Sequence, residues 1–190
     1  MTPDELPRRA VLWFHGFNVD KETHRAELER FARAGFLAVG VDAAGLGERR
    51  MPHDGSKQAM LAFADATAAE VPLLVDALLR DGIPTVAIAG VSMGGYIVYR
   101  AALLEPRLSA AVAILGSPEG LDFSAFAHVP LLSITAERDK NVPPAPARAL
   151  HTPHGNPATN YIELPGAQHL LTAEEWAPAV GAAIRFCGGR

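Results

Sequence analysis

Hydrophobic residues in this chain gather in short continuous runs, without the strict alternation of a strand that has one face in solvent. Such runs, bounded by glycine, proline and charged residues, predict strands that are buried on both faces. The first run, AVLWFHGF, ends in a His-Gly-Phe turn. Six segments predict strands, at residues 10–17, 36–43, 85–91, 110–117, 129–137 and 161–166.

Between these segments, apolar residues recur three and four positions apart, which is the spacing of one helix face. Pro72 is expected to kink or divide the longest of the predicted helices. Strands that alternate with helices predict the α/β class, with a parallel sheet and helices on both of its faces. The predicted helices run from a cap at Asp20 to about Ala34, from Ser56 to Arg80, from Ser92 to a stop before Pro106, near 145–150, and onward from a capping box at Thr172 and Glu175.

Length and composition indicate one globular domain. The 190 residues are 49% hydrophobic and 20% charged, which suits a folded core. We expect a single domain over residues 1–190, with residues 1–9 as an N-terminal extension. The formal net charge of −4, without a basic run, argues against a nucleic-acid partner. The hydrophobic runs are far shorter than the roughly 20 residues that cross a bilayer, so we expect no membrane segment.

The single cysteine and the first residues bear on the compartment. Cys187 cannot form an intrachain disulfide, and we interpret it as a packing residue on the last helix. The opening stretch MTPDELPRRA has no apolar signal core. We therefore expect a soluble cytoplasmic protein, either a monomer or a homodimer.

Chemically active residue types follow four of the predicted strands. His15, Gly16, Phe17 and Asn18 end the first strand, and Ser92 in GVSMGG follows the third. Functional loops of open parallel sheets leave the carboxyl ends of the strands. Asp139 follows the fifth strand and His169 follows the sixth, so a serine, an aspartate and a histidine occur in that order. Among the common serine-hydrolase arrangements, this order is that of the α/β-hydrolases.

A serine hydroxyl is a weak nucleophile and needs a base beside it. Ser92 lies in Gly-x-Ser-x-Gly, where Gly90 and Gly94 permit a sharp turn that exposes the hydroxyl; the alternative is a glycine-rich turn with an incidental serine. His169 is the candidate base and Asp139 the residue that orients it. Two further acids are rivals for Asp139, namely Glu137 and Asp122.

Four local motifs together resemble the α/β-hydrolase family. They are His15-Gly16, the Ser92 elbow, Asp139-x-x-Val142-Pro143 and Gly166-x-x-His169. The chain most resembles small serine esterases related to dienelactone hydrolases and prolyl-oligopeptidase catalytic domains, although dienelactone hydrolases carry cysteine in place of this serine. The resemblance implies a minimal fold of about six mostly parallel strands. The stretch 116–128 is too short for a lid domain.

The resemblance also implies an activity. It points to a serine hydrolase that cleaves short-chain or small acyl esters through an acyl-enzyme, with no cofactor. The backbone N–H groups of Phe17 and Met93 would form the oxyanion hole, and their side chains would shape the pocket. A thioesterase, an amidase or peptidase, or a perhydrolase could use the same groups. A binding protein on a hydrolase scaffold is the non-catalytic alternative. A nucleotide-binding sheet protein is a further alternative, but it would need a glycine-rich phosphate loop after the first strand, where this chain has His-Gly-Phe-Asn.

Several other residues are weaker candidates for the substrate pocket. His15 and Asn18 follow the first strand, with His15 interpreted as a loop-supporting residue, and Phe123 and Phe126 would form a pocket wall or pack ordinarily. Arg49 and Arg50 could meet a substrate carboxylate. We assign no chemistry to His24, His151 or His154. The last two lie in HTPHG, which has no cysteine or carboxylate set nearby to complete a metal site.

Overall fold

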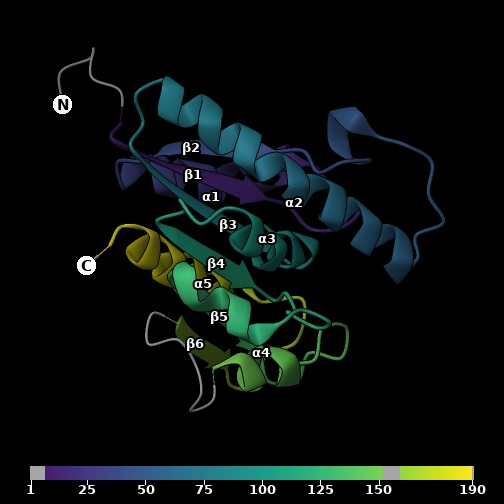
Figure 1. The fold of residues 1–190 in the computed structure, drawn as a ribbon. Helices are drawn as coiled ribbons and strands as arrows, with labels where there is room; N and C mark the ends of the chain where they lie inside the picture. The colour runs from purple at the N-terminus through teal and green to yellow at the C-terminus, as the bar shows by residue number, and fades with distance from the viewer. Residues whose placement is uncertain (1–6, 152–158, 190) are drawn as a thin grey trace.

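A computed structural model describes residues 7–151 and 159–189. Its centre is one parallel sheet in the order β2-β1-β3-β4-β5-β6 (Figure 1). This arrangement confirms the predicted six-stranded α/β fold. The strands are β1 (Arg9–Phe14), β2 (Leu37–Val41), β3 (Thr85–Val91), β4 (Ala110–Ile114), β5 (Leu131–Ala136) and β6 (Thr159–Leu164). The helices are α1 (Arg25–Arg33), α2 (Lys57–Arg80), α3 (Met93–Leu104), α4 (Ala145–Leu150) and α5 (Ala173–Cys187).

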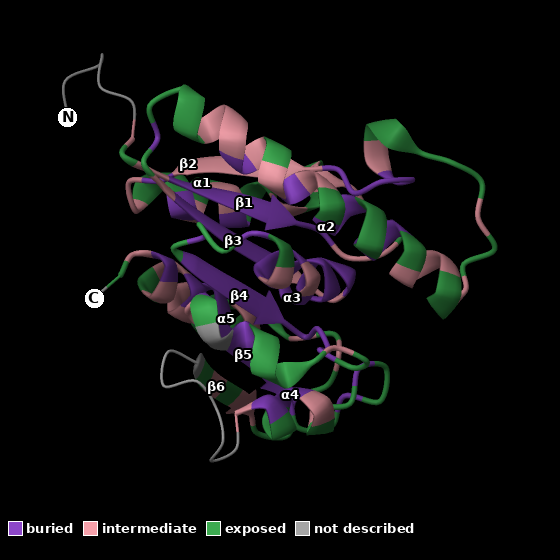
Figure 2. Ribbon diagram, viewed as in Figure 1, coloured by how far each residue is buried: buried purple, intermediate pink, exposed green. Residues whose placement is uncertain are grey.

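Alternate side chains of each inner strand enter two separate cores. Leu12 and Phe14 of β1 pack with α2 and α3 on one face, whereas Val11 and Trp13 pack with α1 and α5 on the other. Figure 2 shows β1, β3 and β4 as continuous buried ribbons. Continuous hydrophobic runs therefore mark the strands that have neighbours on both sides and helices on both faces.

The second strand is an exception to that prediction. All five residues of β2 are half-buried, because β2 lies at the edge of the sheet and has only β1 as a neighbour. The sequence run 36–43 looks as apolar as the inner strands, but only Phe36 before the strand and the residues after it are fully buried.

The helix boundaries follow the capping residues. Ser56 caps α2, and Thr172 and Glu175 form the predicted capping box of α5. Asp20 caps a short 3-10 turn, Lys21–His24, that leads into α1. Pro72 does not divide α2, which continues from Lys57 to Arg80. Buried neighbours such as Val71 and Val75 hold this helix against α3 and the sheet, so packing outweighs one missing backbone hydrogen bond.

The start of the sheet corrects one predicted boundary. Arg9 is the first residue of β1, so the sheet begins inside the predicted extension 1–9. Its guanidinium donates hydrogen bonds to the carbonyls of Ala34 at 2.7 Å and Gly188 at 3.3 Å. Cys187 is buried at the end of α5, as predicted, and burial raises the pKa of its thiol to about 12.

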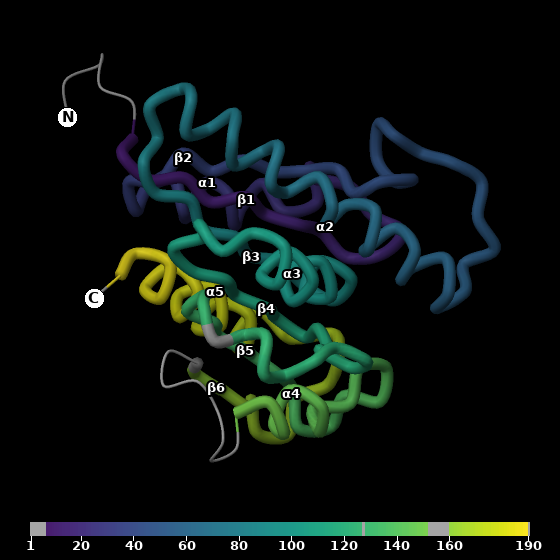
Figure 3. Tube along the Cα trace, in the orientation of Figure 1, coloured from purple at the N-terminus to yellow at the C-terminus, as the bar shows by residue number. Residues whose placement is uncertain are grey.

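Every strand runs in the same direction, so the loops that follow them meet at one edge of the sheet. The trace in Figure 3 returns through a helix or loop before each new strand. The connection after β4 contains only a six-residue 3-10 turn, Phe123–His128, and no lid domain. That edge of the sheet is therefore left open above the ends of β1, β3, β5 and β6.

Candidate active site

Ser92 occupies a sharp turn between β3 and α3. Its backbone has φ 55° and ψ −115°, a left-handed conformation that residues with a side chain rarely adopt. The turn requires glycine at both flanks: a methyl group on Gly90 would lie 2.6 Å from the backbone of Gly94, and one on Gly94 would collide with the carbonyl of Phe14. The Ser92 N–H donates to the Ile114 carbonyl at 2.8 Å, which anchors the turn to β4. A strained backbone held by close packing is typical of a functional position.

The fold brings Ser92, His169 and Asp139 into one hydrogen-bonded chain. The hydroxyl oxygen of Ser92 lies 2.9 Å from Nε2 of His169, and Nδ1 of His169 lies 2.7 Å from Oδ2 of Asp139. The Asp139 side chain is fully buried, whereas that of His169 keeps 17% of its exposure. Three residues that are separated by 30 and more positions in the chain thus meet above the sheet.

Asp139 is also fixed by its own loop. Its second oxygen, Oδ1, accepts the N–H groups of Asn141 at 2.9 Å and Val142 at 2.8 Å. The rival acids are engaged elsewhere: Glu137 accepts the Gly166 N–H at 2.6 Å, and exposed Asp122 caps the 3-10 turn after β4. Of the three acids, Asp139 is the one whose carboxylate contacts His169.

The predicted oxyanion-hole residues flank Ser92. Met93 is the first residue of α3, a position whose N–H has no acceptor within the helix. Phe17 follows Gly16, where a methyl group would lie 3.8 Å from Cβ of Ser92. The Phe17 side chain lines the cavity above Ser92, as expected. The Met93 side chain does not, since it is fully buried in the core between α2, α3 and the sheet.

A cavity of about 690 Å³ opens above Ser92 and His169. Apolar side chains form much of its wall, and its polar members besides Ser92 and His169 come from the loop after β1, the start of α2, α3 and the loop after β5. The lining consists of Gly16, Phe17, Val19, Thr23, His24, Gly55, Ser56, Lys57, Met60, Val91, Ser92, Tyr96, Asn141, Val142, His169 and Leu170.

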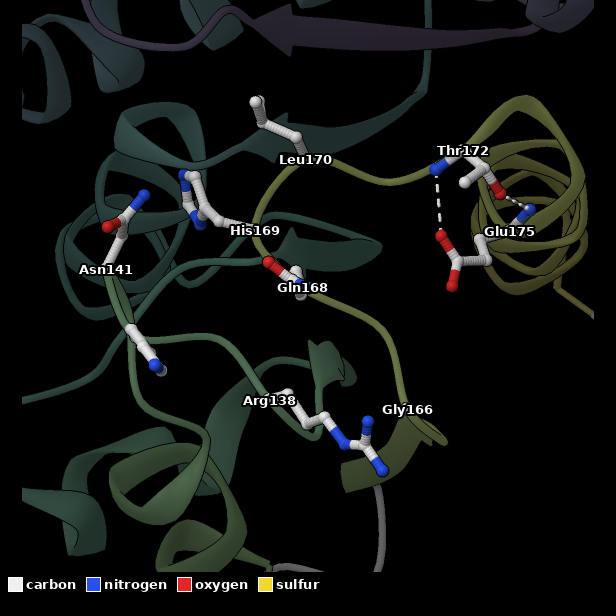
Figure 4. Close-up of a pocket in the computed structure, with 9 residues that line it drawn as sticks. Arg138, Asn141, Gly166, Gln168, His169, Leu170, Thr172 and Glu175 are labelled. Atoms are coloured by element: carbon white, nitrogen blue, oxygen red, sulfur yellow. Dashed lines mark hydrogen bonds between the residues drawn. The ribbon is translucent and has the colours of Figure 1, made fainter.

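A second hollow lies on the other side of His169. Figure 4 shows His169 between Asn141 and Leu170, with Arg138, Gln168 and Gly166 farther along the same depression. Its volume is about 570 Å³, and its acid, Glu175, is occupied by the capping box with Thr172. The two hollows share His169, Leu170 and Asn141, so they meet at the histidine.

The weaker pocket candidates do not line this cavity, and His15 and Phe126 take the supporting and packing roles that the sequence left open. His15 is fully buried: its Nδ1 donates to the Gly16 carbonyl at 2.7 Å and its Nε2 accepts the Ala43 N–H at 3.1 Å. Burial lowers the pKa of this imidazole, which serves the loop rather than a substrate. Phe126 is buried against Tyr99, at 6.0 Å between ring centres, while Asn18 and Phe123 are exposed outside the cavity lining.

The arginine pair is not part of the cavity either. Arg49 makes two hydrogen bonds to Glu70, at 2.7 and 2.5 Å, and a third to the Asp42 carbonyl. Arg50 is exposed beside Met51 and His53. Glu70, on α2, faces Arg49 across the surface, and no pattern in the sequence indicates that pairing.

His154 lies outside the described residues.

The sequence interpretation missed several residues of the cavity lining. His24, Lys57, Tyr96 and Leu170 line the cavity although each lies in a segment that looks like ordinary surface or helix. Lys57 pairs with Glu119 at 3.0 Å, and this hydrogen bond raises the pKa of its ammonium group. In residues 7–151 and 159–189, no three His, Cys, Asp or Glu side chains are grouped as a metal site requires.

Comparison with known proteins assigns the chain to a family. The family model described as serine aminopeptidase, S33, an α/β-hydrolase family, matches residues 5–120, more than half of the chain. The chain belongs to this α/β-hydrolase family. The particular resemblance to dienelactone hydrolases stays a prediction. No helix in the described ranges is both long and apolar enough to cross a bilayer.

Individual relatives are more distant. The chain is 28% identical to bifunctional epoxide hydrolase 2 of Rattus norvegicus over 109 residues, which are 57% of this chain and 18% of that protein. The chain thus spans less than a fifth of the length of that curated relative.

Solved structures share the fold over nearly the whole chain. TT1662 from Thermus thermophilus superposes with a TM-score of 0.78 at 24% identity, covering 98% of this chain and 92% of that one. A cold-adapted esterase from an Arctic intertidal metagenomic library gives 0.74 at 21% identity, covering 95% of this chain and 83% of the esterase. At such identities the likeness establishes the α/β-hydrolase fold alone.

Proposed function

We propose that the protein is a serine hydrolase that cleaves small carboxylic esters through an acyl-enzyme. The observation that carries the proposal is the hydrogen-bonded chain from the Ser92 hydroxyl through His169 to buried Asp139. Each member has the geometry its role needs: a nucleophile on a strained turn in the cavity wall, a base at 2.9 Å, and a carboxylate beside the other nitrogen of the base.

The proposed reaction uses these groups in turn. His169 Nε2 takes the hydroxyl proton as Ser92 Oγ attacks the ester carbonyl, and the resulting imidazolium is stabilised by Asp139. The N–H groups of Phe17 and Met93 would hold the oxyanion; one such donor contributes about 3–4 kcal/mol to the transition state. His169 then protonates the departing alcohol, and water releases the acyl group by the same route.

The nucleophile limits which hydrolysis is possible. Opening an epoxide with Ser92 would leave an ether, which has no carbonyl for water to attack, so the enzyme could not turn over. The reaction named for the rat relative is therefore not proposed for this chain. A carboxylic ester, by contrast, gives an acyl-enzyme that water can hydrolyse.

The cavity favours esters over N-terminal peptides. An aminopeptidase must bind the ammonium group of its substrate, usually with a carboxylate. The cavity lining within the described residues includes Lys57 and no aspartate or glutamate. We therefore place esters first, although thioesters, amides and peracids would engage the same nucleophile and base. The open cavity of about 690 Å³ suits short acyl chains.

One chain would supply every group that this reaction uses. We accordingly propose one catalytic domain that acts as a monomer or homodimer on a small-molecule ester, without a cofactor, nucleic acid or membrane as partner. A cytoplasmic location is part of the same proposal.

The direct test is hydrolysis of nitrophenyl esters of increasing acyl length, next to the matching amides and a styrene epoxide. We expect short esters to be cleaved best, with kcat/KM falling for long chains. Ser92→Ala should reduce kcat by at least about 10³-fold. The matched control is Ser124→Ala, at an exposed serine on the 3-10 turn after β4. Ester cleavage that survives in Ser92→Ala would refute the proposal.

A further inference from the structure

His24 lies in the wall of the cavity that contains Ser92. It ends the 3-10 turn before α1, and its side chain is only 13% exposed. Its ring packs against the rings of Trp13 and Trp176, with ring centres at 5.5 and 6.2 Å, and the two tryptophan rings also contact each other at 6.4 Å. A histidine that is packed against two tryptophans and is mostly buried has little freedom to turn, so its ring atoms present a fixed pattern to whatever fills the cavity.

Glu27 fixes the proton on this imidazole. Its carboxylate is buried; one oxygen accepts the indole N–H of Trp176 at 2.6 Å, and the other lies 3.4 Å from Nδ1 of His24. Burial acts to raise the pKa of Glu27, but the hydrogen bonds from His24 and Trp176 outweigh it and lower the pKa to about 2. An ionised carboxylate beside Nδ1 holds the imidazole proton there.

The other ring nitrogen is then left as an acceptor. When the ring carries a single proton and that proton is on Nδ1, Nε2 offers only a lone pair. Within residues 7–151 and 159–189, the polar contact of the His24 ring is the one from Nδ1 to Glu27, and Nε2 is not among the buried atoms that lack a partner, so Nε2 is accessible. Because His24 lines the cavity, we infer that this accessible Nε2 is the atom that meets a ligand there.

We propose that His24 is a specificity-determining residue whose Nε2 accepts a hydrogen bond from a hydroxyl group on the ester substrate, and that Glu27 is its positioning residue. The inference rests on the proposed ester hydrolysis. A fixed acceptor in an otherwise largely apolar wall favours substrates that bring a donor and disfavours those that leave the acceptor unpaired. The preferred substrates are therefore hydroxylated esters, such as monoesters of a diol or esters of a hydroxy acid.

Two matched substrate series test this inference. On the alcohol side they are hydroxyethyl, methoxyethyl and propyl butyrate; on the acyl side they are the ethyl esters of β-hydroxybutyrate, β-methoxybutyrate and isovalerate. The hydroxyl can donate, the methoxy group can only accept, and the third group does neither. In at least one series, we expect wild-type kcat/KM to favour the hydroxyl ester over its apolar twin by about three- to tenfold, the effect of one neutral hydrogen bond.

His24→Phe should reduce that preference to about one, and the readout is the ratio of the two kcat/KM values measured for the same variant. The matched control is His53→Phe, at a histidine that contacts the ring of Phe17 without lining the cavity. It should keep the preference.

Glu27→Gln provides a test that a purely structural role of His24 would not pass. The amide oxygen can still accept the Trp176 indole N–H, so the amide NH₂ faces Nδ1 of His24 and the imidazole proton moves to Nε2. Nε2 would then donate, and the methoxy ester should gain relative to the hydroxyl ester. This variant keeps the size of the side chain, so it remains informative if His24→Phe does not fold.

Two outcomes overturn the inference. If folded His24→Phe keeps the preference over the apolar ester, or if Glu27→Gln leaves the ratio of methoxy to hydroxyl ester at its wild-type value, His24 only packs against the tryptophans. If the wild-type protein hydrolyses none of the six esters and a fluorophosphonate fails to label Ser92, the proposed function itself fails and the inference fails with it. Labelling of Ser92 together with an unchanged preference separates the first case from the second.

Discussion

Replacing Asp139 with asparagine should remove activity while leaving the fold intact. In the wild type, Oδ1 accepts the N–H groups of Asn141 and Val142, and Oδ2 faces Nδ1 of His169 at 2.7 Å. An asparagine can keep the two backbone bonds only with its oxygen at the Oδ1 position. Its NH₂ group then faces His169 and moves the imidazole proton to Nε2, 2.9 Å from the Ser92 hydroxyl. A protonated Nε2 cannot accept the proton of the nucleophile.

The magnitude follows from that tautomer. A wrong tautomer in a Ser-His-Asp arrangement lowers kcat by about 10⁴-fold, which corresponds to about 5 kcal/mol of transition-state stabilisation. The Asp139→Asn variant would keep the backbone bonds, so its free energy of unfolding should differ from that of the wild type by less than about 1 kcal/mol. Asp139→Ala instead leaves the buried Val142 N–H without its acceptor and should cost about 1–3 kcal/mol of stability.

The assay compares kcat for a short nitrophenyl ester with the urea midpoint of each variant. We expect Asp139→Asn to lose activity while its urea midpoint stays near that of the wild type. Asp139→Ala should lose activity and unfold at a lower urea concentration. If Asp139→Asn keeps more than about a tenth of the wild-type kcat while it is fully folded, Asp139 does not control the tautomer of His169 and the reasoning is refuted.

Further predictions concern stability and reactivity. Gly95→Ala should destabilise the fold by about 1–3 kcal/mol or more in urea titrations, because its methyl group would lie 2.7 Å from Cα of Gly116, whereas Gly181→Ala on α5 should add up to about 1 kcal/mol. A thiol reagent at pH 8 should modify Cys187 only after denaturation, since burial raises its pKa to about 12. Burial lowers the pKa of His151 from 6.5 to about 4, because the buried ring disfavours the charged form. The free energy of unfolding should therefore be highest above pH 6.5 and decrease as the pH falls toward 4. His151→Gln should flatten that fall by about 1–2 kcal/mol between pH 7 and 5.

Much of the fold could be predicted because the hydrophobic runs report burial directly. The inner strands β1, β3, β4 and β5 are buried on both faces, and the capping residues Ser56 and Thr172 mark helix starts. The edge position of β2 could not be predicted, because a strand's sequence does not record how many neighbours it has. The helix is also not divided at Pro72, because tertiary packing of α2 outweighs the local preference of proline.

The candidate site, too, could be predicted only in part. Ser92, Asp139 and His169 could be placed together because each follows a parallel strand, and such ends meet at one edge of the sheet. His24 and Lys57 could not, because they reach the cavity from the starts of two helices that carry no motif. Phe126 shows the converse: its apolar character suits a pocket wall and a core equally, and the fold buries it against Tyr99.

The central claim is that Ser92 is an activated nucleophile, and covalent labelling tests it most directly. Native protein would be treated with a fluorophosphonate, digested and analysed by peptide mass spectrometry, with His169→Ala treated in parallel. We predict a single adduct on Ser92 in the wild type and at least about 10³-fold slower labelling in His169→Ala. A folded wild-type protein that stays unlabelled, or that is labelled equally fast without His169, would contradict the claim.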